Sequence, residues 1–230
     1  MPRAEVSSPP DISSSQPASP PRRGRFITLE GGEGAGKTTQ IGLLEEHLRG
    51  SGHDVMTTRE PGGTPGAEQI RGLVTNGSVD RWHPMTELLL MMAARSDHVE
   101  RVLRPSLTAG FWVISDRFHD SSRVYQGLAG GLGLDVVDRL HEPLLVGTLP
   151  DLTLVLDLPV ETGLARRHAG GGAGRFEAKD HAFHETVRKG FLELSRREPR
   201  RIRVVDATLP VAAVARQIRD AVDALEAGTG

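Results

Sequence analysis

The chain has 230 residues, of which 37% are hydrophobic and 25% are charged, and its formal net charge at pH 7 is −2. This composition fits one sizeable globular domain and argues against a nucleic-acid-binding protein, which normally carries a marked basic excess. Cysteine is absent, which excludes disulfides and thiolate metal sites, and no apolar run approaches the ~18 residues of a membrane helix.

Residues 1–23 are dominated by proline and serine and contain no aromatic side chain. Such a segment buries too little apolar surface to offset the entropy lost on ordering, so we expect a disordered tail. A docking or regulatory role for this tail stays open. It lacks the apolar stretch of a secretory signal, and we therefore expect a cytoplasmic protein. Residues 24–230 are predicted to form the single folded domain.

Beyond the tail, β-rich runs alternate with helical stretches. Five continuously apolar runs predict strands that are buried on both faces of a parallel sheet: residues 25–30, 54–59, 111–116, 152–158 and 202–206. Helices are predicted near residues 37–49, 66–76, 84–109, 134–146, 160–168, 180–198 and 210–225. This alternation is typical of a doubly wound α/β fold, in which ligands gather beyond the carboxyl ends of the strands.

The segment after the first predicted strand matches the phosphate-binding pattern G-x-x-x-x-G-K-[ST] in full. Its residues, with the threonine that follows, are Gly31, Gly32, Glu33, Gly34, Ala35, Gly36, Lys37, Thr38 and Thr39. Glycines let successive backbone N–H groups turn toward phosphate oxygens, and the following helix adds its N-terminal partial charge. Lys37 is suited to the β and γ phosphates of ATP, and Thr38 can offer its hydroxyl to Mg²⁺. We expect an NTP-binding loop rather than a glycine-rich turn without a ligand.

Asp116 ends the third predicted strand, and Arg117 follows it directly. A carboxylate at this place in a P-loop fold can hold Mg²⁺ or help to position an acceptor, and the adjacent guanidinium can clamp an anionic acceptor with two donors. A surface ion pair is the alternative. The only lysines, at residues 37, 179 and 189, do not belong to the Asn-Lys-x-Asp pattern that reads guanine in GTPases. These features indicate a compact NTP-using enzyme with a small acceptor.

Residues 166–177 combine arginines with four glycines, at residues 170, 171, 172 and 174. The glycines disfavour a rigid helix, so we interpret the segment as a mobile lid. Phosphoryl transfer requires cationic groups around the developing charge and the exclusion of water, and a basic lid supplies both. A solvated linker is the alternative.

Taken together, these motifs resemble bacterial thymidylate kinase, a family of P-loop nucleoside monophosphate kinases. The resemblance runs from about residue 25 to the last predicted helix, and it rests on residues 30–39, 58–64, 93–95, 116–126, 150–157 and 175–177. It implies a P-loop NTPase fold with a five-stranded parallel sheet, ATP and Mg²⁺ as cofactors, dTMP as the acceptor, and a homodimer. Neither nucleic acid nor a membrane is expected as a partner.

The resemblance also implies roles for individual residues around the acceptor. Arg117 would bind the phosphate of dTMP, while Asp116 would support Mg²⁺ and the geometry of transfer. Arg95 would hydrogen-bond to the edge of thymine. Ser121 and Ser122 would line the pocket of the base.

Further implied roles concern the sugar and the transferred group. Tyr125 would pack near C2′ of the sugar and disfavour ribonucleotides, and Glu33 would contact the 3′-hydroxyl or help to organise the metal. Because the loop carries Glu33 and no arginine, a catalytic arginine is expected from the lid, with Arg175 and Arg166 as the candidates.

Two positions depart from the family pattern. Met91 stands where the family typically has a phenylalanine that stacks on thymine, and a thioether can lie against a ring but is softer. The lid is glycine-rich, for example at Gly170, where related lids often carry more arginines. These departures leave two alternatives open: a kinase for another small nucleotide or nucleoside, and a catalytically idle nucleotide-binding protein.

Overall fold

The computed structural model describes residues 23–169 and 174–228. The predicted tail lies outside the described residues except for Arg23, whose guanidinium pairs with Asp151 at 3.1 Å. Of the predicted lid, residues 170–173 lie outside them as well.

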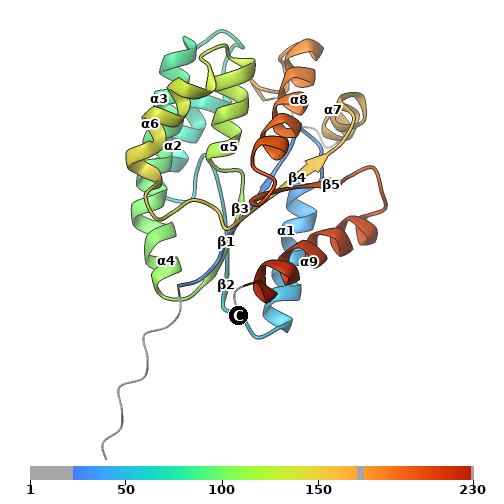
Figure 1. The fold of residues 1–230 in the computed structure, drawn as a ribbon. Coiled ribbons are helices and arrows are strands. Elements are labelled where there is room, and N and C mark those ends of the chain that lie inside the picture. The colour runs from blue at the N-terminus through green and yellow to red at the C-terminus, as the bar shows by residue number, and fades with distance from the viewer. Residues whose placement is uncertain (1–22, 170–173, 229–230) are drawn as a thin grey trace, which may run out of the picture.

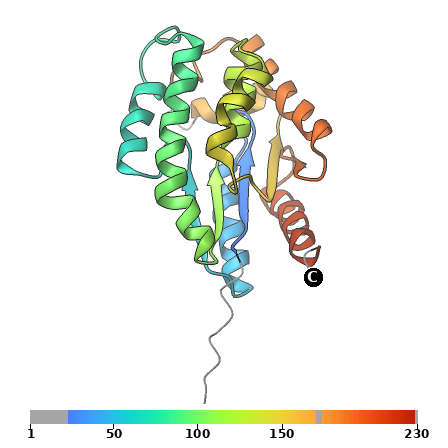
Figure 2. The same cartoon turned by 60° about the vertical axis from the view of Figure 1, so that its left-hand side comes forward.

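The core is a five-stranded parallel sheet, as predicted (Figure 1). Its strands are β1 (Phe26–Glu30), β2 (Val55–Arg59), β3 (Trp112–Asp116), β4 (Leu152–Asp157) and β5 (Ile202–Asp206). They pair in the order β2-β3-β1-β4-β5, and Figure 2 shows them side by side with their arrowheads pointing the same way. The strands β1, β3 and β4 are buried on both faces, as predicted, because helices cover the sheet on both sides. For the edge strands β2 and β5 this expectation is wrong, since each of them carries exposed residues, such as Thr57 in β2 and Arg203 in β5.

The two faces of the sheet have separate hydrophobic cores. On one face Ile27 packs with residues of α1 (Lys37–Gly50) and α9 (Val211–Ala227). On the other face its neighbour Phe26 packs with residues of η1 (Val99–Leu103) and α4 (Arg104–Thr108). Figure 1 shows the helices on both sides of the sheet, which gives three layers.

The other predicted helices are present with boundaries shifted by one or two residues. They are α2 (Pro65–Thr75), α6 (Leu134–Leu145), α7 (Val160–Ala169) and α8 (His181–Arg197). The long helix predicted near residues 84–109 consists of α3 (Pro84–His98), the π-helical turn η1 and α4 in succession. None of the helices in the described part of the chain combines the length and the hydropathy that a membrane span requires.

One helical stretch was not predicted: α5 (His119–Ser122) followed by the π-helical η2 (Arg123–Ala129). Its local sequence is a poor helix former, but its Asp120 is buried and accepts hydrogen bonds from Arg201 at 2.7 and 3.0 Å. Buried charged hydrogen bonds to a residue about 80 positions away thus hold this stretch in place. Sequence periodicity does not register such a contact.

The sheet order sets the position of the site. The chain passes from β1 to the distant β2, returns to β3 beside β1, and then crosses to β4 on the other side of β1. The loops after β1 and β3 therefore lie next to each other at the carboxyl edge of the sheet, near the point where the winding reverses.

Candidate active site

A cavity of about 620 Å³ opens at the carboxyl edge of the sheet. The predicted site residues that line it are Glu33, Gly34, Ala35, Gly36, Lys37, Thr38, Thr39, Met91, Arg95, Asp116, Arg117, Ser121, Ser122, Tyr125 and Arg166. Gly31 and Gly32, the first residues of the loop, instead line a second cavity of about 20 Å³. Arg175 lines neither of these two cavities.

The loop of residues 31–36 requires glycine at positions where the neighbouring backbone leaves no room for a side chain. Gly34 has φ +68°, and a Cβ there would lie 2.0 Å from the backbone oxygen of Gly163 in α7. Gly163 is equally constrained, since its own Cβ would lie 2.3 Å from the Glu33 carbonyl oxygen. The loop is thus supported from behind by the backbone of α7, and this leaves its inner side free for a ligand.

Lys37 begins α1 and folds back across the loop. Its Nζ atom donates to the carbonyls of Gly31 at 3.4 Å and of Gly32 at 3.2 Å. Burial, followed by the positive charge of Arg117, lowers the pKa of the Lys37 amine, whereas Asp116 and Glu33 oppose this shift. An anionic ligand in the cavity would offer this ammonium group a far better partner than two carbonyls.

Arg117 connects the loop to the segment after β3. It is the one non-glycine residue with positive φ, 70°, in the described part of the chain, and this left-handed backbone directs its side chain toward the loop. Its guanidinium donates to the Gly31 carbonyl at 3.0 Å, to Glu33 Oε1 at 2.9 Å and to Ser121 Oγ at 3.2 Å. Its charge therefore lies between the phosphate-binding loop and the predicted acceptor pocket.

Glu33 accepts a second hydrogen bond on the same oxygen, from the Tyr125 hydroxyl at 3.0 Å. The guanidinium carbon of Arg117 lies 5.0 Å from the centroid of the Tyr125 ring, within the range of a cation–π contact. These three side chains form one cluster, in which Arg117 and Tyr125 can exchange their hydrogen bonds to Glu33 for hydrogen bonds to a bound anion.

Glu30, the last residue of β1, connects this strand to the segment that follows β3. It accepts from the Phe118 backbone N–H at 2.8 Å and from Ser121 Oγ at 2.6 Å. Burial, reinforced by the negative charge of Asp120, raises the pKa of Glu30 from 4.5 to about 7. Sequence reasoning assigned Glu30 no role, although a carboxylate that ends a largely apolar strand directly before a phosphate loop is a signal that could have been used.

At the other end of the cavity Arg95 is nearly fully buried on α3. Its Nε atom donates to Glu60 Oε2 at 2.6 Å, and its Nη1 atom donates to Ser122 Oγ at 3.0 Å. Met91, one turn earlier on α3, lines the same cavity. The structure thus brings together the residues for which a base pocket was predicted.

The two lid arginines are placed differently. Arg166 is an exposed residue of α7 that lines the cavity, as does its neighbour Arg167. Arg175 is fully buried, pairs with Glu87 and donates to the Val74 carbonyl at 3.0 Å. Its guanidinium anchors the end of the lid on α2 and α3 and does not face the cavity, so of the two candidates only Arg166 lies beside the reaction space.

The comparisons with known proteins agree with this geometry. A family model described as thymidylate kinase matches residues 29–218. Thymidylate kinase of Caulobacter vibrioides is 56% identical over 200 residues, which cover 87% of this chain and 96% of the relative. The corresponding protein of Ruegeria pomeroyi is 49% identical and covers 86% of this chain and 94% of its own. The chain belongs to the thymidylate kinase family.

A crystal structure of thymidylate kinase from Ehrlichia chaffeensis superposes with a TM-score of 0.68 at 31% identity, over 87% of this chain and 99% of that one. Membership of the thymidylate kinase family, predicted from the motifs, is thus confirmed by both sequence and fold, and the chain is a kinase with the P-loop NTPase fold.

Several cavity residues of this thymidylate kinase family member were not predicted. Arg59 and Glu60 line the cavity, and both lie in the segment 58–64 that supported the resemblance without being given roles. Arg71 of α2 also lines the cavity and donates to the Pro61 carbonyl at 2.8 Å. Nothing in the local sequence distinguishes Arg71 from a surface arginine of an amphipathic helix.

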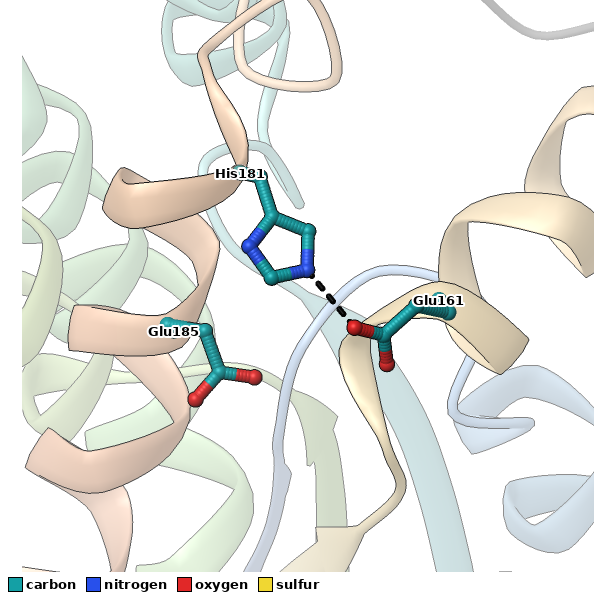
Figure 3. Close-up of side chains that lie close together, drawn as sticks. All are labelled: Glu161, His181 and Glu185. Carbon is teal, nitrogen blue, oxygen red and sulfur yellow. Dashed lines mark hydrogen bonds and ion pairs between the residues drawn. The ribbon is translucent and has the colours of Figure 1, made fainter.

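One cluster outside the cavity has side chains of the types that bind metals. Figure 3 shows His181 and Glu185 on α8 facing Glu161 on α7, with His181 Nε2 2.8 Å from Glu161 Oε1. The group is largely exposed, lies at the positive N-terminal turns of both helices, and has Lys189 and Arg188 nearby. These charges disfavour a cation, so we assign it the simpler role of joining α7 to α8.

The contact between Gly163 and the loop leads to a stability prediction. Gly163→Ala should destabilise the protein by about 1–3 kcal/mol and raise the KM for ATP, because its Cβ has only backbone atoms to displace. The matched control is Gly42→Ala in α1, where a Cβ would meet nothing within 4 Å and should stabilise by about 0.5–1 kcal/mol. Urea denaturation and steady-state kinetics measure both. Equal effects of the two substitutions would contradict the account of the loop.

The raised pKa of Glu30 predicts a dependence of stability on pH. Between about pH 4.5 and 7 the folded state retains a proton that the unfolded state has lost, so the free energy of unfolding should fall as the pH rises through this window. The loss should be on the order of 3 kcal/mol. Denaturation at pH 5, 6, 7 and 8 should show a clearly smaller decline for Glu30→Gln. Parallel curves for the two proteins would refute the assignment.

Proposed function

We propose that this chain transfers the γ-phosphoryl group of ATP to dTMP, giving dTDP and ADP, as a step of dTTP synthesis. The observation that carries the proposal is that the phosphate loop, the Asp116–Arg117 pair and Arg95 line one cavity in a member of the thymidylate kinase family. The volume of this cavity, about 620 Å³, is typical of sites for small molecules.

The donor would bind at the loop. Backbone N–H groups of residues 31–36 and the N-terminus of α1 would surround its phosphates, and Lys37 would exchange its two carbonyl contacts for the β and γ phosphates. These groups supply positive charge where it builds up during transfer.

Mg²⁺ is implied by the fold family, and the residues present fit it. Thr38 offers an exposed hydroxyl at the start of α1 and Asp116 a carboxylate at the end of β3, and both line the cavity. Oxygen donors of this kind, few in number, suit an ion that also binds phosphates and water. When bound, Mg²⁺ neutralises part of the charge on the donor phosphates.

The acceptor would occupy the side of the cavity formed by α3 and η2. Arg117 would leave Glu33 to bind the phosphate of dTMP with its two-pronged donor set, and Tyr125 would lie against the sugar. Arg95 would face the edge of thymine, and Met91 would lie against its ring.

The reaction is then a direct in-line transfer. A phosphate oxygen of dTMP attacks the γ-phosphorus of ATP, the bond from that phosphorus to the β–γ bridging oxygen breaks, and the electron pair leaves with ADP. The acceptor is already an anion at neutral pH, so no general base is needed, and catalysis rests on positioning and electrostatics. Arg166 is our candidate for the lid arginine that meets the transferring group.

Other expectations from the sequence stay predictions. They are the homodimer, the cytoplasmic location, the closing motion of the lid and the independent tail.

An acceptor panel tests the proposed function. ADP release from Mg·ATP should be fast with dTMP and much slower with dUMP, UMP, dCMP or thymidine. Thymidine lacks the phosphate for Arg117, and dCMP lacks the keto group for Arg95. UMP carries a 2′-hydroxyl next to Tyr125, and dUMP lacks the methyl group that would pack beside Met91. Comparable turnover with several pyrimidine monophosphates would instead indicate a loosened base pocket around Met91. Absence of turnover with every acceptor would overturn the proposal.

The control for the panel is Lys37→Ala. It removes the ammonium group from the loop and should lower turnover by about a hundredfold or more, since such electrostatic groups contribute on that scale. Circular dichroism should show an unchanged fold. Near-normal turnover of Lys37→Ala would show that transfer occurs elsewhere.

A further inference from the structure

The guanidinium of Arg95 is oriented by its neighbours from three directions. Glu60 accepts from Nε, while Ser122 and His141 both lie against Nη1, with His141 Nε2 at 2.5 Å. The guanidinium carbon lies over the ring of Phe118, 5.2 Å from its centroid. Within the described ranges, no side chain or carbonyl accepts a hydrogen bond from Nη2. This amino group is therefore the part of Arg95 that is available to a ligand in the cavity.

His141 is a fully buried residue of α6 whose tautomer follows from its contacts. Its Nδ1 atom lies 2.8 Å from the Val137 carbonyl, which can only accept, so Nδ1 carries the proton. Nε2 is then an acceptor and faces Nη1 of Arg95, which can only donate. Burial, with the positive charge of Arg95, lowers the pKa of His141 to about 3, so the ring stays neutral at physiological pH.

The opposite side of Arg95 is held in the same manner. Glu60 accepts from His98 Nδ1 at 2.8 Å, and His98 Nε2 lies 2.7 Å from Thr58 Oγ1 at the end of β2. All of these side chains except Thr58 are almost completely buried. Arg95 thus lies between Glu60, which His98 supports on the β2 side, and His141 of α6, and it has little freedom to rotate.

We propose that His141 is a positioning residue for base selection, because its neutral Nε2 holds Nη1 of Arg95 so that Nη2 alone faces the acceptor base. This inference rests on the proposed function. A guanidinium donates hydrogen bonds and accepts none. Fixed in this orientation, Nη2 pairs with the carbonyl at position 4 of thymine, and it opposes the amino group that cytosine carries there.

The selectivity depends on orientation as much as on charge. Nη1 has two N–H groups, and Ser122 and His141 lie against them. If His141 no longer accepted, one of these N–H groups would be unpaired in the interior, the guanidinium would rotate to satisfy it, and Nη2 would no longer be aimed at position 4 of the base. A site that is built to hydrogen-bond one group rejects an analogue strongly only while its own polar groups are held in place.

The test uses two substitutions that each preserve one side of the imidazole. His141→Asn keeps a donor where Nδ1 stands and lacks the acceptor, whereas His141→Gln can place its amide oxygen where Nε2 stands. His141→Asn should raise the KM for dTMP about tenfold, as expected for a lost hydrogen bond to a charged group, with kcat and the KM for ATP little changed. The preference for dTMP over dCMP should fall at least as much, and His141→Gln should restore most of both.

Val222→Ala is the structural control. Val222 is a buried residue of α9 and packs in the core on the other face of the sheet, with Ile27, away from Arg95 and its neighbours. This substitution should lower the melting temperature without changing the KM for dTMP or the preference over dCMP. A second measurement needs no variant: ¹⁵N NMR of the wild-type protein should show His141 protonated at Nδ1 and unprotonated at Nε2.

The outcomes separate the inference from the function on which it rests. A wild-type protein that does not phosphorylate dTMP overturns both. An active wild type whose His141→Asn variant retains the KM for dTMP and the preference over dCMP overturns the role of His141 alone. A protonated Nε2 in the NMR experiment overturns it as well, whether or not the variants fold.

Discussion

The structure depends on one contact between two loops. β1 and β3 are neighbours in the sheet, so the phosphate loop and the Asp116–Arg117 segment leave it side by side. Arg117 bridges them through Glu33 and the Gly31 carbonyl, in a left-handed conformation that costs backbone energy. The contact places the guanidinium of Arg117 at the point where the donor and acceptor phosphates would meet. The hydrogen bonds of this guanidinium to the protein can be exchanged for hydrogen bonds to phosphate.

Around this contact the chain buries several charged side chains. Buried ions are costly unless they have partners. Two or more hydrogen-bond partners are present for each of Glu30, Glu33, Glu60, Arg95 and Arg117. Glu30 accepts a hydrogen bond from Ser121 in the segment that carries Arg117, and Glu60 and His141 accept hydrogen bonds from Arg95. These networks contribute less to stability than to orientation, since they leave one donor face of each arginine directed toward the cavity.

Sequence reasoning succeeded where the chemistry is local. The phosphate loop was predictable because its glycines answer a backbone requirement and Lys37 a charge requirement within eight residues of sequence. The central strands β1, β3 and β4 were predictable because burial on both faces needs continuous apolar runs. The stretch α5–η2 was missed because Arg201, distant in sequence, stabilises it. Contacts between residues distant in sequence also explain two further misses. Arg175 is kept away from the cavity by its buried contact with Glu87. His141 pairs with Arg95, which lies 46 positions away.

Arg117 joins the two halves of the site, and in the proposed function it is the group that receives the acceptor phosphate. Calorimetric titration of dTMP into Arg117→Lys tests this role most directly, because lysine keeps the charge but loses the planar pair of donors. We expect the affinity for dTMP to fall at least about tenfold while the protein remains folded. An affinity equal to that of the wild type would contradict it and would move the phosphate-binding role to another arginine of the cavity.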